Sequence, residues 1–306
     1  MRKIRIVGVG HCCQDNLCTV EAYPPEDGST HILAIDDSQG GGAVATAMVA
    51  AARLGAEAAF ISNLGTDETG THILEGFQRE NVDIRGIERL PGYRSSTSYV
   101  MVDPEKGTRT KFPYRDNLPS IEWTQEKKQM IADADALHLD GTQWENAMAA
   151  ADIACAAGTV ISLDGCSRQA DNAKNLALSD RADILIMNAV YPFRVSGKKT
   201  AEEALSFFAS RRPRTVLAMT LGDKGCLYYQ DGQVHAIPAF FVKAVDTTGA
   251  GDVFHGAFLA RYLETGQLEA SLRFASAVSA LKCEKPGGRE GIPTRAQAEA
   301  FLRTKV

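Results

Sequence analysis

Short runs of apolar residues alternate with longer stretches of helical periodicity along most of this 306-residue chain. The apolar runs have the length of buried strands, whereas the longer stretches repeat apolar residues every three or four positions. This alternation predicts a mostly parallel sheet that is covered by helices on both faces. The predicted strands are Ile4–Val9, Ala58–Ser62, Ala136–Asp140, Thr159–Leu163, Asp183–Met187 and Thr215–Met219. The predicted helices are Ala43–Leu54, Thr69–Glu80, Asn146–Ala157 and Ala201–Ser210.

Two other parts of the chain alternate polar and apolar residues in the manner of half-exposed antiparallel strands. Because both interrupt the α/β pattern, we expect a small sheet that projects from one α/β domain formed by residues 1–306. The insertions that form it are expected at about residues 11–39 and 94–117. The strand pairs are Asp15–Glu21 with His31–Asp37, and Ser96–Asp103 with Arg109–Arg115.

The most informative stretch runs from Val245 to Phe258, where threonines and small residues precede an aspartate and an apolar helix pattern. Gly249-Ala250-Gly251 forms a tight turn directly before Asp252. Free backbone N–H groups at a helix start bind anions, and the helix dipole strengthens the site. A carboxylate beside those donors can accept the proton of a substrate hydroxyl while the donors hold the phosphate under attack. The stretch therefore predicts phosphoryl transfer to an alcohol.

This stretch is similar to the second motif of the ribokinase-like, or PfkB, carbohydrate kinases. Gly40-Gly41-Gly42, opening into Ala43–Leu54, resembles the first motif of that family. The resemblance covers nearly the whole chain and implies a ribokinase-like α/β fold, in which a small β-sheet lid covers the sugar site and often forms a dimer contact. Further landmarks follow in the family's order: Leu64–Gly70, Leu163-Asp164, Asn188, Thr220–Gly225 and Pro286-Gly287-Gly288.

The resemblance implies an ATP-dependent kinase that phosphorylates a hydroxyl, expected to be primary, of a small sugar or sugar derivative. Asp252 is the predicted catalytic base, and the backbone N–H groups of Gly249, Ala250 and Gly251 are predicted to surround the transferred phosphoryl group. The predicted sugar-binding residues are Asp15, Gly41, Gly42 and Thr46. The predicted nucleotide-binding residues are Asn188, Thr220, Gly222 and Gly225.

Two cations enter these expectations. Mg²⁺ is expected because nucleotide phosphates need a hard, oxygen-bound cation. Asp246 and Thr248 are candidates for holding a monovalent cation, K⁺, as in some relatives.

The chain departs from the family pattern at Thr46, where relatives often carry Asn, and at Ala43, where they often carry Lys. It also has Tyr191 where the family commonly has a Glu, so the Mg²⁺- and phosphate-tuning role of that Glu is not carried over.

Within the family, the C-terminal part of the chain most resembles the branch that contains sulfofructose kinase. The resemblance lies in Val245–Ala257 and in Arg273–Pro293. A sulfonate needs a cationic pocket, and Gln143 is neutral near the point where that branch would be expected to have an arginine. Sulfofructose is therefore one candidate substrate. The candidate cations in or near the predicted lid are Arg94, Arg109, Lys111 and Arg115.

Composition and charge narrow the choice of partners. The net charge of −5, without a basic stripe interleaved with aromatic residues, argues against nucleic-acid binding. No apolar stretch is long enough to span a bilayer or to serve as a secretory signal, which favours the cytoplasm. The seven cysteines lack a paired C-x-x-C spacing, so reduced thiols are expected rather than zinc ligands. The expected partners are a sugar, ATP and a second copy of the chain bound through the lid.

Three other functions compete with a sugar kinase. A nucleoside kinase would share the predicted fold and chemistry, and a sugar sensor on the same fold would bind without turnover. A dinucleotide-dependent dehydrogenase is suggested by Gly8-Val9-Gly10, but Cys13 occupies the third glycine position and the following segment is predicted to be a strand. No G-x-x-x-x-G-K-[ST] run occurs, which removes a P-loop enzyme.

Overall fold

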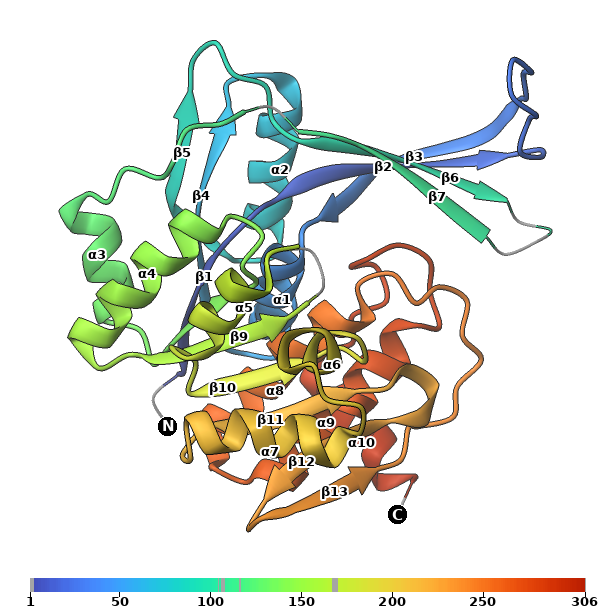
Figure 1. The fold of residues 1–306 in the computed structure, drawn as a ribbon. Helices are drawn as coiled ribbons and strands as arrows, with labels where there is room; N and C mark the ends of the chain where they lie inside the picture. The colour runs from blue at the N-terminus through green and yellow to red at the C-terminus, as the bar shows by residue number, and fades with distance from the viewer. Residues whose placement is uncertain (1–2, 104, 106–107, 116, 167–169, 306) are drawn as a thin grey trace.

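A computed structural model describes residues 3–103, 105, 108–115, 117–166 and 170–305, and within these ranges the chain forms two sheets (Figure 1). The larger sheet is parallel from β11 to β5 and ends in an antiparallel hairpin, β12–β13. Its order is β13 (Gln233–Ile237), β12 (Cys226–Gln230), β11 (Val216–Thr220), β10 (Ile184–Met187), β9 (Val160–Gly165), β8 (Ala136–Leu139), β1 (Arg5–Val9), β4 (Glu57–Gly65) and β5 (Asp83–Leu90).

Helices cover both faces of this sheet, as the alternation along the sequence predicts. Successive residues of a strand point to opposite faces, so Ile6 packs into one core while Val7 and Val9 pack into the other. The first core receives α1 (Ala43–Arg53), α2 (Glu68–Arg79), α8 (Ala250–Thr265), α9 (Leu268–Lys282) and α10 (Arg295–Arg303). The second receives α3 (Gln125–Ala132), α4 (Trp144–Ala157), α5 (Asn172–Ser179), α6 (Tyr191–Ser196) and α7 (Ala201–Arg211). The predicted α/β class is confirmed.

The edge strand β5 is the element of the large sheet that the hydrophobic pattern missed. Its sequence places Arg85, Glu88 and Arg89 among the apolar residues, so no buried run marks it. An edge strand can carry these charges because one of its sides has no neighbouring strand. The strand nevertheless pairs with β4 in parallel along most of its length.

The small sheet projects from one side of the molecule, with its far end well away from the large sheet (Figure 1). Strands β2 and β6 are parallel neighbours at its centre, and each pairs with its outer strand in antiparallel fashion. All four strands overlap the predicted ones, whereas positions 104, 106–107 and 116 of the predicted insertion lie outside the described residues. The order is β3 (Ile32–Gly41), β2 (Cys13–Val20), β6 (Thr97–Asp103) and β7 (Thr108–Tyr114).

The large sheet brings chemically useful residues to one edge. The parallel strands end at a common edge, which is where ligands of open α/β sheets bind. Asp164 lies in β9 near its end, Asn188 directly follows β10, and Thr220 ends β11. None of the described helices combines the length and the apolar character that crossing a membrane requires.

Candidate active site

The α8 helix begins at a glycine that no other residue could replace without strain. Gly249 caps the helix in the left-handed conformation, with φ of 73°, which side chains other than glycine rarely adopt. A Cβ atom at this position would lie 2.9 Å from the carbonyl oxygen of Gly288. The helix starts at Ala250, two residues before the Asp252 start that the apolar periodicity predicts, because the glycine turn itself forms the first residues. Asp252 therefore lies in the first turn.

The predicted anion site retains two of its three amide donors. The Gly249 and Gly251 N–H groups have no hydrogen-bond partner among the described residues. The Ala250 N–H instead donates to the Thr247 carbonyl oxygen at 3.2 Å and closes the turn, which corrects its predicted role as an open donor. Gly251 is exposed, and a Cβ atom there would meet nothing within 4 Å. The space in front of this turn is thus open to a ligand.

Close packing between α1 and α8 fixes this helix start relative to the residues predicted to bind the sugar. A Cβ atom at Gly256 would lie 2.1 Å from the carbonyl oxygen of Ala47, so the two backbones approach without an intervening side chain. One turn after Asp252, the His255 Nε2 atom lies 3.2 Å from the buried Asp164 carboxylate. That contact holds the His255 ring in the interior, where it packs against His138.

The predicted nucleotide residues Thr220, Gly222 and Gly225 line one cavity of about 440 Å³ together with Ala250 and Gly251. A cavity of this size and mixed character suits a small organic ligand. The apolar lining of this cavity comes mainly from the loop after β13 and from α9. The lining was not predicted from the sequence. This lining includes Phe240, Phe241, Val242, Ala280 and Cys283, with the Phe241 side chain almost fully exposed.

Asn188 does not line that cavity, and its neighbour Tyr191 is a core residue. The Asn188 Oδ1 atom accepts the N–H groups of Val190 and Tyr191 at 3.0 and 2.9 Å, which holds the start of α6. The Tyr191 hydroxyl lies 2.8 Å from Ser179 Oγ and donates to the Asn175 carbonyl oxygen at 3.0 Å. Burial raises the pKa of this phenol. Tyr191 therefore has a packing role and does not substitute for the acidic residue common in the family.

On the other side of the site, Asp15 presents a buried carboxylate with acceptor capacity to spare. It lies in β2 opposite Gln39 of β3 and is only 9% exposed. Among the described residues, its carboxylate accepts one hydrogen bond, from the Cys13 thiol at 3.6 Å. Burial, with the charge of Asp15 as a second cause, raises the pKa of that thiol, which keeps it protonated as a donor. A carboxylate has about four acceptor positions, so Asp15 can still bind hydroxyl groups.

The predicted glycines beside Asp15 are required by close contacts. A Cβ atom at Gly41 would lie 2.7 Å from Asp15 Oδ2. Gly42 caps α1 with φ of 100°, and a Cβ atom there would lie 2.3 Å from the His11 carbonyl oxygen. The structure thus brings Asp15, Gly41 and Gly42 together at the base of the small sheet.

Thr46 contacts an arginine that the sequence did not single out. The Arg289 Nε donates to Thr46 Oγ1 at 3.3 Å, and its Nη2 donates to the Gly41 carbonyl oxygen at 3.1 Å. The Thr46 hydroxyl accepts this hydrogen bond and keeps its own O–H as a donor, so its sugar contact stays a prediction. Arg289 is 8% exposed and forms no ion pair with a described residue. Burial lowers the pKa of its guanidinium, while nearby charges such as Asp15 oppose the shift.

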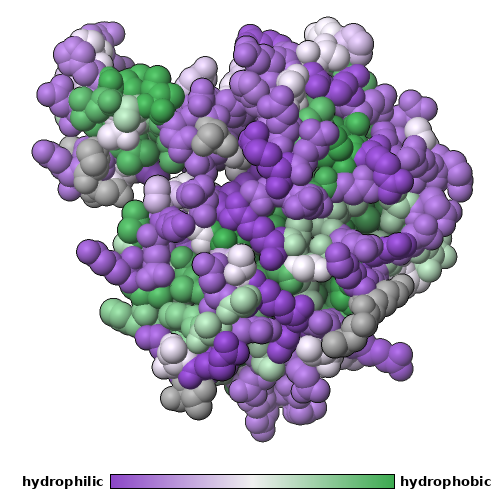
Figure 2. All heavy atoms as spheres, turned by 180° about the vertical axis from the view of Figure 1, so that it is seen from behind, coloured by the Kyte–Doolittle hydropathy of each residue, from purple (hydrophilic) through white to green (hydrophobic). Residues whose placement is uncertain are grey.

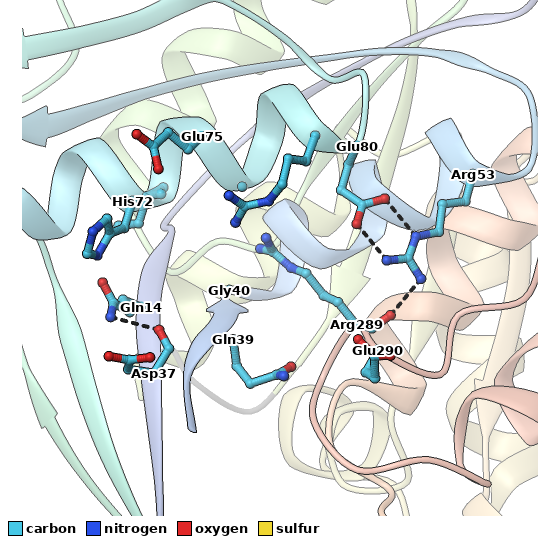
Figure 3. A pocket seen from close by; sticks show the side chains of 13 residues that line it. Gln14, Asp37, Gln39, Gly40, Arg53, His72, Glu75, Glu80, Arg289 and Glu290 are labelled. Carbon is cyan, nitrogen blue, oxygen red and sulfur yellow. Dashed lines mark hydrogen bonds and ion pairs between the residues drawn. The ribbon is translucent and has the colours of Figure 1, made fainter. Parts of the chain in front are cut away.

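Figure 3 shows Arg289 passing Gly40 into a cavity of about 420 Å³ on the side of α2. A Cβ atom at Gly40 would lie 2.1 Å from Arg289 Nη1, so the first glycine of the Gly40-Gly41-Gly42 motif leaves room for the guanidinium. The Arg53 side chain holds the loop that carries Arg289, because it donates to the Arg289 carbonyl oxygen at 2.8 Å and pairs with Glu80.

Of the four cations predicted for a sulfonate pocket, Arg109 is the one that reaches the turn before α8. Its guanidinium contacts the side-chain oxygens of Asp246 and Thr248, the residues predicted to hold a monovalent cation. Arg94 lies over the Tyr114 ring, and Lys111 and Arg115 are exposed. The four therefore do not gather into one cationic pocket.

The fold and the glycine-started α8 helix define an α/β kinase of the ribokinase-like type, and comparisons with known proteins agree. The model of the pfkB family carbohydrate kinases matches residues 3–295. Probable fructokinase-2 of Arabidopsis thaliana is 31% identical, and the match covers 94% of each chain. The chain therefore belongs to the pfkB family of carbohydrate kinases.

Solved structures show the same similarity across the whole chain. A candidate ribokinase from Agrobacterium tumefaciens has a TM-score of 0.90 and 31% identity, covering 99% of both chains. A ribokinase II candidate from E. coli, solved with ATP and Mg²⁺, has a TM-score of 0.85 at 22% identity and covers 98% of this chain and 99% of its own. These neighbours confirm the ribokinase-like fold that the sequence motifs predict.

Proposed function

We propose that this chain transfers the γ-phosphoryl group of ATP to a hydroxyl, most simply a primary one, of a small sugar or sugar derivative. The observation that carries the proposal is the helix start at Gly249–Asp252. Open amides of this turn border a cavity lined by the predicted nucleotide residues, and Asp252 lies in the first turn of the same helix.

In this mechanism Asp252 takes the proton of the attacking hydroxyl, while the Gly249 and Gly251 amides donate to the phosphoryl oxygens as charge develops. Asp15 would orient the sugar by accepting hydrogen bonds from its hydroxyls. Phe240, Phe241 and Val242 offer an apolar surface for a nucleobase, with Thr220, Gly222 and Gly225 beside it.

Mg²⁺ would enter with the nucleotide. The described residues contain no cluster of three or more His, Cys, Asp or Glu side chains that could hold a metal ion. Mg²⁺ usually keeps several waters and is held largely by the phosphate oxygens of a bound nucleotide, so the exposed space in front of Gly251 fits it without a dedicated protein cage. When bound, it would neutralise charge on the phosphate oxygens.

A homodimer formed through the small sheet is part of the proposal. Figure 2 shows apolar side chains gathered on this projecting part, and the exposed large residues there are Ile32, Leu33, Ile35, Tyr99, Phe112 and Tyr114. Exposed apolar patches mark interaction surfaces. The double variant Leu33→Glu/Ile35→Glu should convert a dimer into a monomer in sedimentation equilibrium. Wild-type protein that sediments as a monomer at micromolar concentration would contradict this contact.

An anionic sugar is the second candidate substrate, and Arg289 favours it. This buried guanidinium contacts the Gly41 carbonyl oxygen and Thr46 but no carboxylate among the described residues. Buried charges are normally paired, so an anionic substituent on the sugar would add a direct ion pair to the more distant charges of Asp15 and Glu80. A sulfonated ketose, suggested by the resemblance in the segment that contains Arg289, belongs to this class.

The function is tested by measuring ADP release from Mg²⁺-ATP with ketoses, aldoses, sugar acids, sulfofructose, phosphosugars and nucleosides. We expect turnover with one sugar class, and ³¹P NMR of the product should identify the phosphorylated hydroxyl. Turnover confined to nucleosides would replace the proposal with a nucleoside kinase. Binding of sugar and nucleotide without ADP release would replace it with a sensor.

A further inference from the structure

The oxygen atoms predicted to hold K⁺ already contact cationic or N–H groups of the protein. Asp246 Oδ1 accepts the Thr248 N–H at 2.7 Å and also contacts Arg109, which binds the Thr248 hydroxyl as well. Asp246 Oδ2 accepts the Gly287 N–H at 2.9 Å. The Asp246 carbonyl oxygen accepts a hydrogen bond from the Lys282 ammonium at 2.8 Å. This turn is therefore in contact with two positive charges from elsewhere in the chain.

Lys282 is fully buried, with 0% of its surface exposed. It is the last residue of α9, where the negative end of the helix dipole stabilises a cation. Burial lowers the pKa of its ammonium, and the carboxylates of Asp246 and Asp252 oppose that shift. The ammonium thus lies in the electrostatic neighbourhood of both the cation-site residue and the predicted catalytic base.

A monovalent metal ion does not fit this arrangement. It would need oxygen ligands from Asp246 and Thr248, and the Asp246 carboxylate and carbonyl and the Thr248 hydroxyl each already contact an N–H group or a cationic side chain. It would also lie beside the charges of Lys282 and Arg109 in a poorly solvated place, where like charges repel strongly. The expectation that Asp246 and Thr248 hold K⁺ is therefore not supported by the residues that surround them.

The buried lysine is connected to the anion site through the turn that it holds. Lys282 anchors the backbone of Asp246, and the Asp246 N–H donates to the Cys283 carbonyl oxygen at 3.0 Å. Three residues later Gly249 begins the amide cradle of α8. We propose that the Lys282 ammonium is a resident cation that positions this turn in place of a monovalent metal ion, so that turnover is independent of K⁺.

Lys282 is a positioning residue in this proposal. The proposal is tested by measuring how turnover depends on the monovalent cation in solution. ADP release would be measured at constant ionic strength in tetramethylammonium, Na⁺ and K⁺ salts. Wild-type kcat should be the same in all three. Lys282→Met keeps the length of the side chain but removes its charge. Its kcat should fall roughly tenfold or more, because the Gly249 and Gly251 amides shift away from the phosphoryl group. Lys282→Ala, which leaves space, should regain activity with K⁺ or propylammonium. The exposed Lys285→Ala is the matched control and should behave as wild type.

Strong activation of the wild type by K⁺ would overturn the proposal, as would a Lys282→Met variant with wild-type kcat. A loss in Lys282→Ala that no cation restores would make Lys282 a packing residue only. The proposal rests on the proposed kinase function for its kinetic readout, but thermal unfolding gives a second readout that needs no turnover. The wild-type melting temperature should not change when K⁺ replaces tetramethylammonium, and a rise with K⁺ would overturn the inference even if no substrate is found.

Discussion

The start of α8 and the base of the small sheet carry the two halves of the proposed site, but they are built in different ways. The α8 turn is formed by consecutive residues, Asp246 to Asp252, with its geometry set by Gly249. The proposed sugar side combines β2, β3 and the loop that carries Arg289, which come from opposite ends of the chain. The residues proposed for the chemistry are therefore close in sequence, whereas those proposed for substrate recognition are brought together by contacts between distant segments.

The variant expected to separate the roles of the two regions most strongly is Asp252→Asn, which changes the predicted base alone. The amide cannot accept the hydroxyl proton as a carboxylate does, so kcat should fall by about 10²- to 10⁴-fold, the usual contribution of a general base. The variant should still bind ATP because the amide turn is unchanged. Steady-state ADP release measures the loss.

Asp231→Asn serves as the matched control, since Asp231 lies in the exposed β12–β13 turn with φ of 52°, which Asn also tolerates. It should retain wild-type kcat. An Asp252→Asn enzyme with wild-type kcat would remove the assigned base.

The complementary change on the sugar side is Asp15→Ala. Hydrogen bonds to a charged group contribute about 1.5–3 kcal/mol, so the sugar KM should rise by about 10- to 100-fold. The ATP KM should stay within about twofold of wild type because Asp15 is not among the residues that line the nucleotide cavity. Glu21→Ala, at an exposed position just beyond β2, is the control. If Asp15→Ala left the sugar KM unchanged, the sugar site would have to lie elsewhere.

A smaller effect is expected at the contact that joins the two regions. In Gly256→Ala the added methyl would meet the Ala47 backbone, and overpacking of this kind costs about 1–3 kcal/mol. The melting temperature should fall by several degrees in calorimetry. Gly76→Ala in α2 is the control, because its Cβ atom would approach only the end of the Arg79 side chain, at 3.9 Å. Equal stability of the two variants would mean that α1 and α8 can separate without cost.

The same difference between local and distant contacts explains which parts of the fold could be predicted from the sequence. The period of the apolar residues revealed the buried parallel strands, and the four strands of the small sheet were recognisable from alternation. The edge strand β5 was missed because its charged residues interrupt the apolar run. The pattern of apolar residues identifies a strand when the strand is buried on all sides. It fails for an edge strand, because one of its sides faces solvent.

The site was predictable to the extent that its residues are close in sequence. Gly249 and Asp252 were found from one motif, and the structure places Gly249 at the N-cap of α8 and Asp252 in its first turn. Arg289 and Lys282 were missed, because only the fold brings them to Thr46 and Asp246. A single arginine after two glycines and a lysine at a helix end carry no periodic signal. Thr46 was assigned to the sugar by family position, and this assignment stays a prediction.

The division of labour between Asp252 and Asp15 is tested most directly by calorimetric titration of both variants, Asp252→Asn and Asp15→Ala, with the preferred sugar and with ATP. The account predicts that Asp252→Asn binds both ligands with wild-type affinity, although it does not turn over. It predicts that Asp15→Ala loses affinity for the sugar alone. Equal loss of sugar affinity in both variants, or loss of ATP affinity in Asp15→Ala, would contradict separate sites for chemistry and recognition.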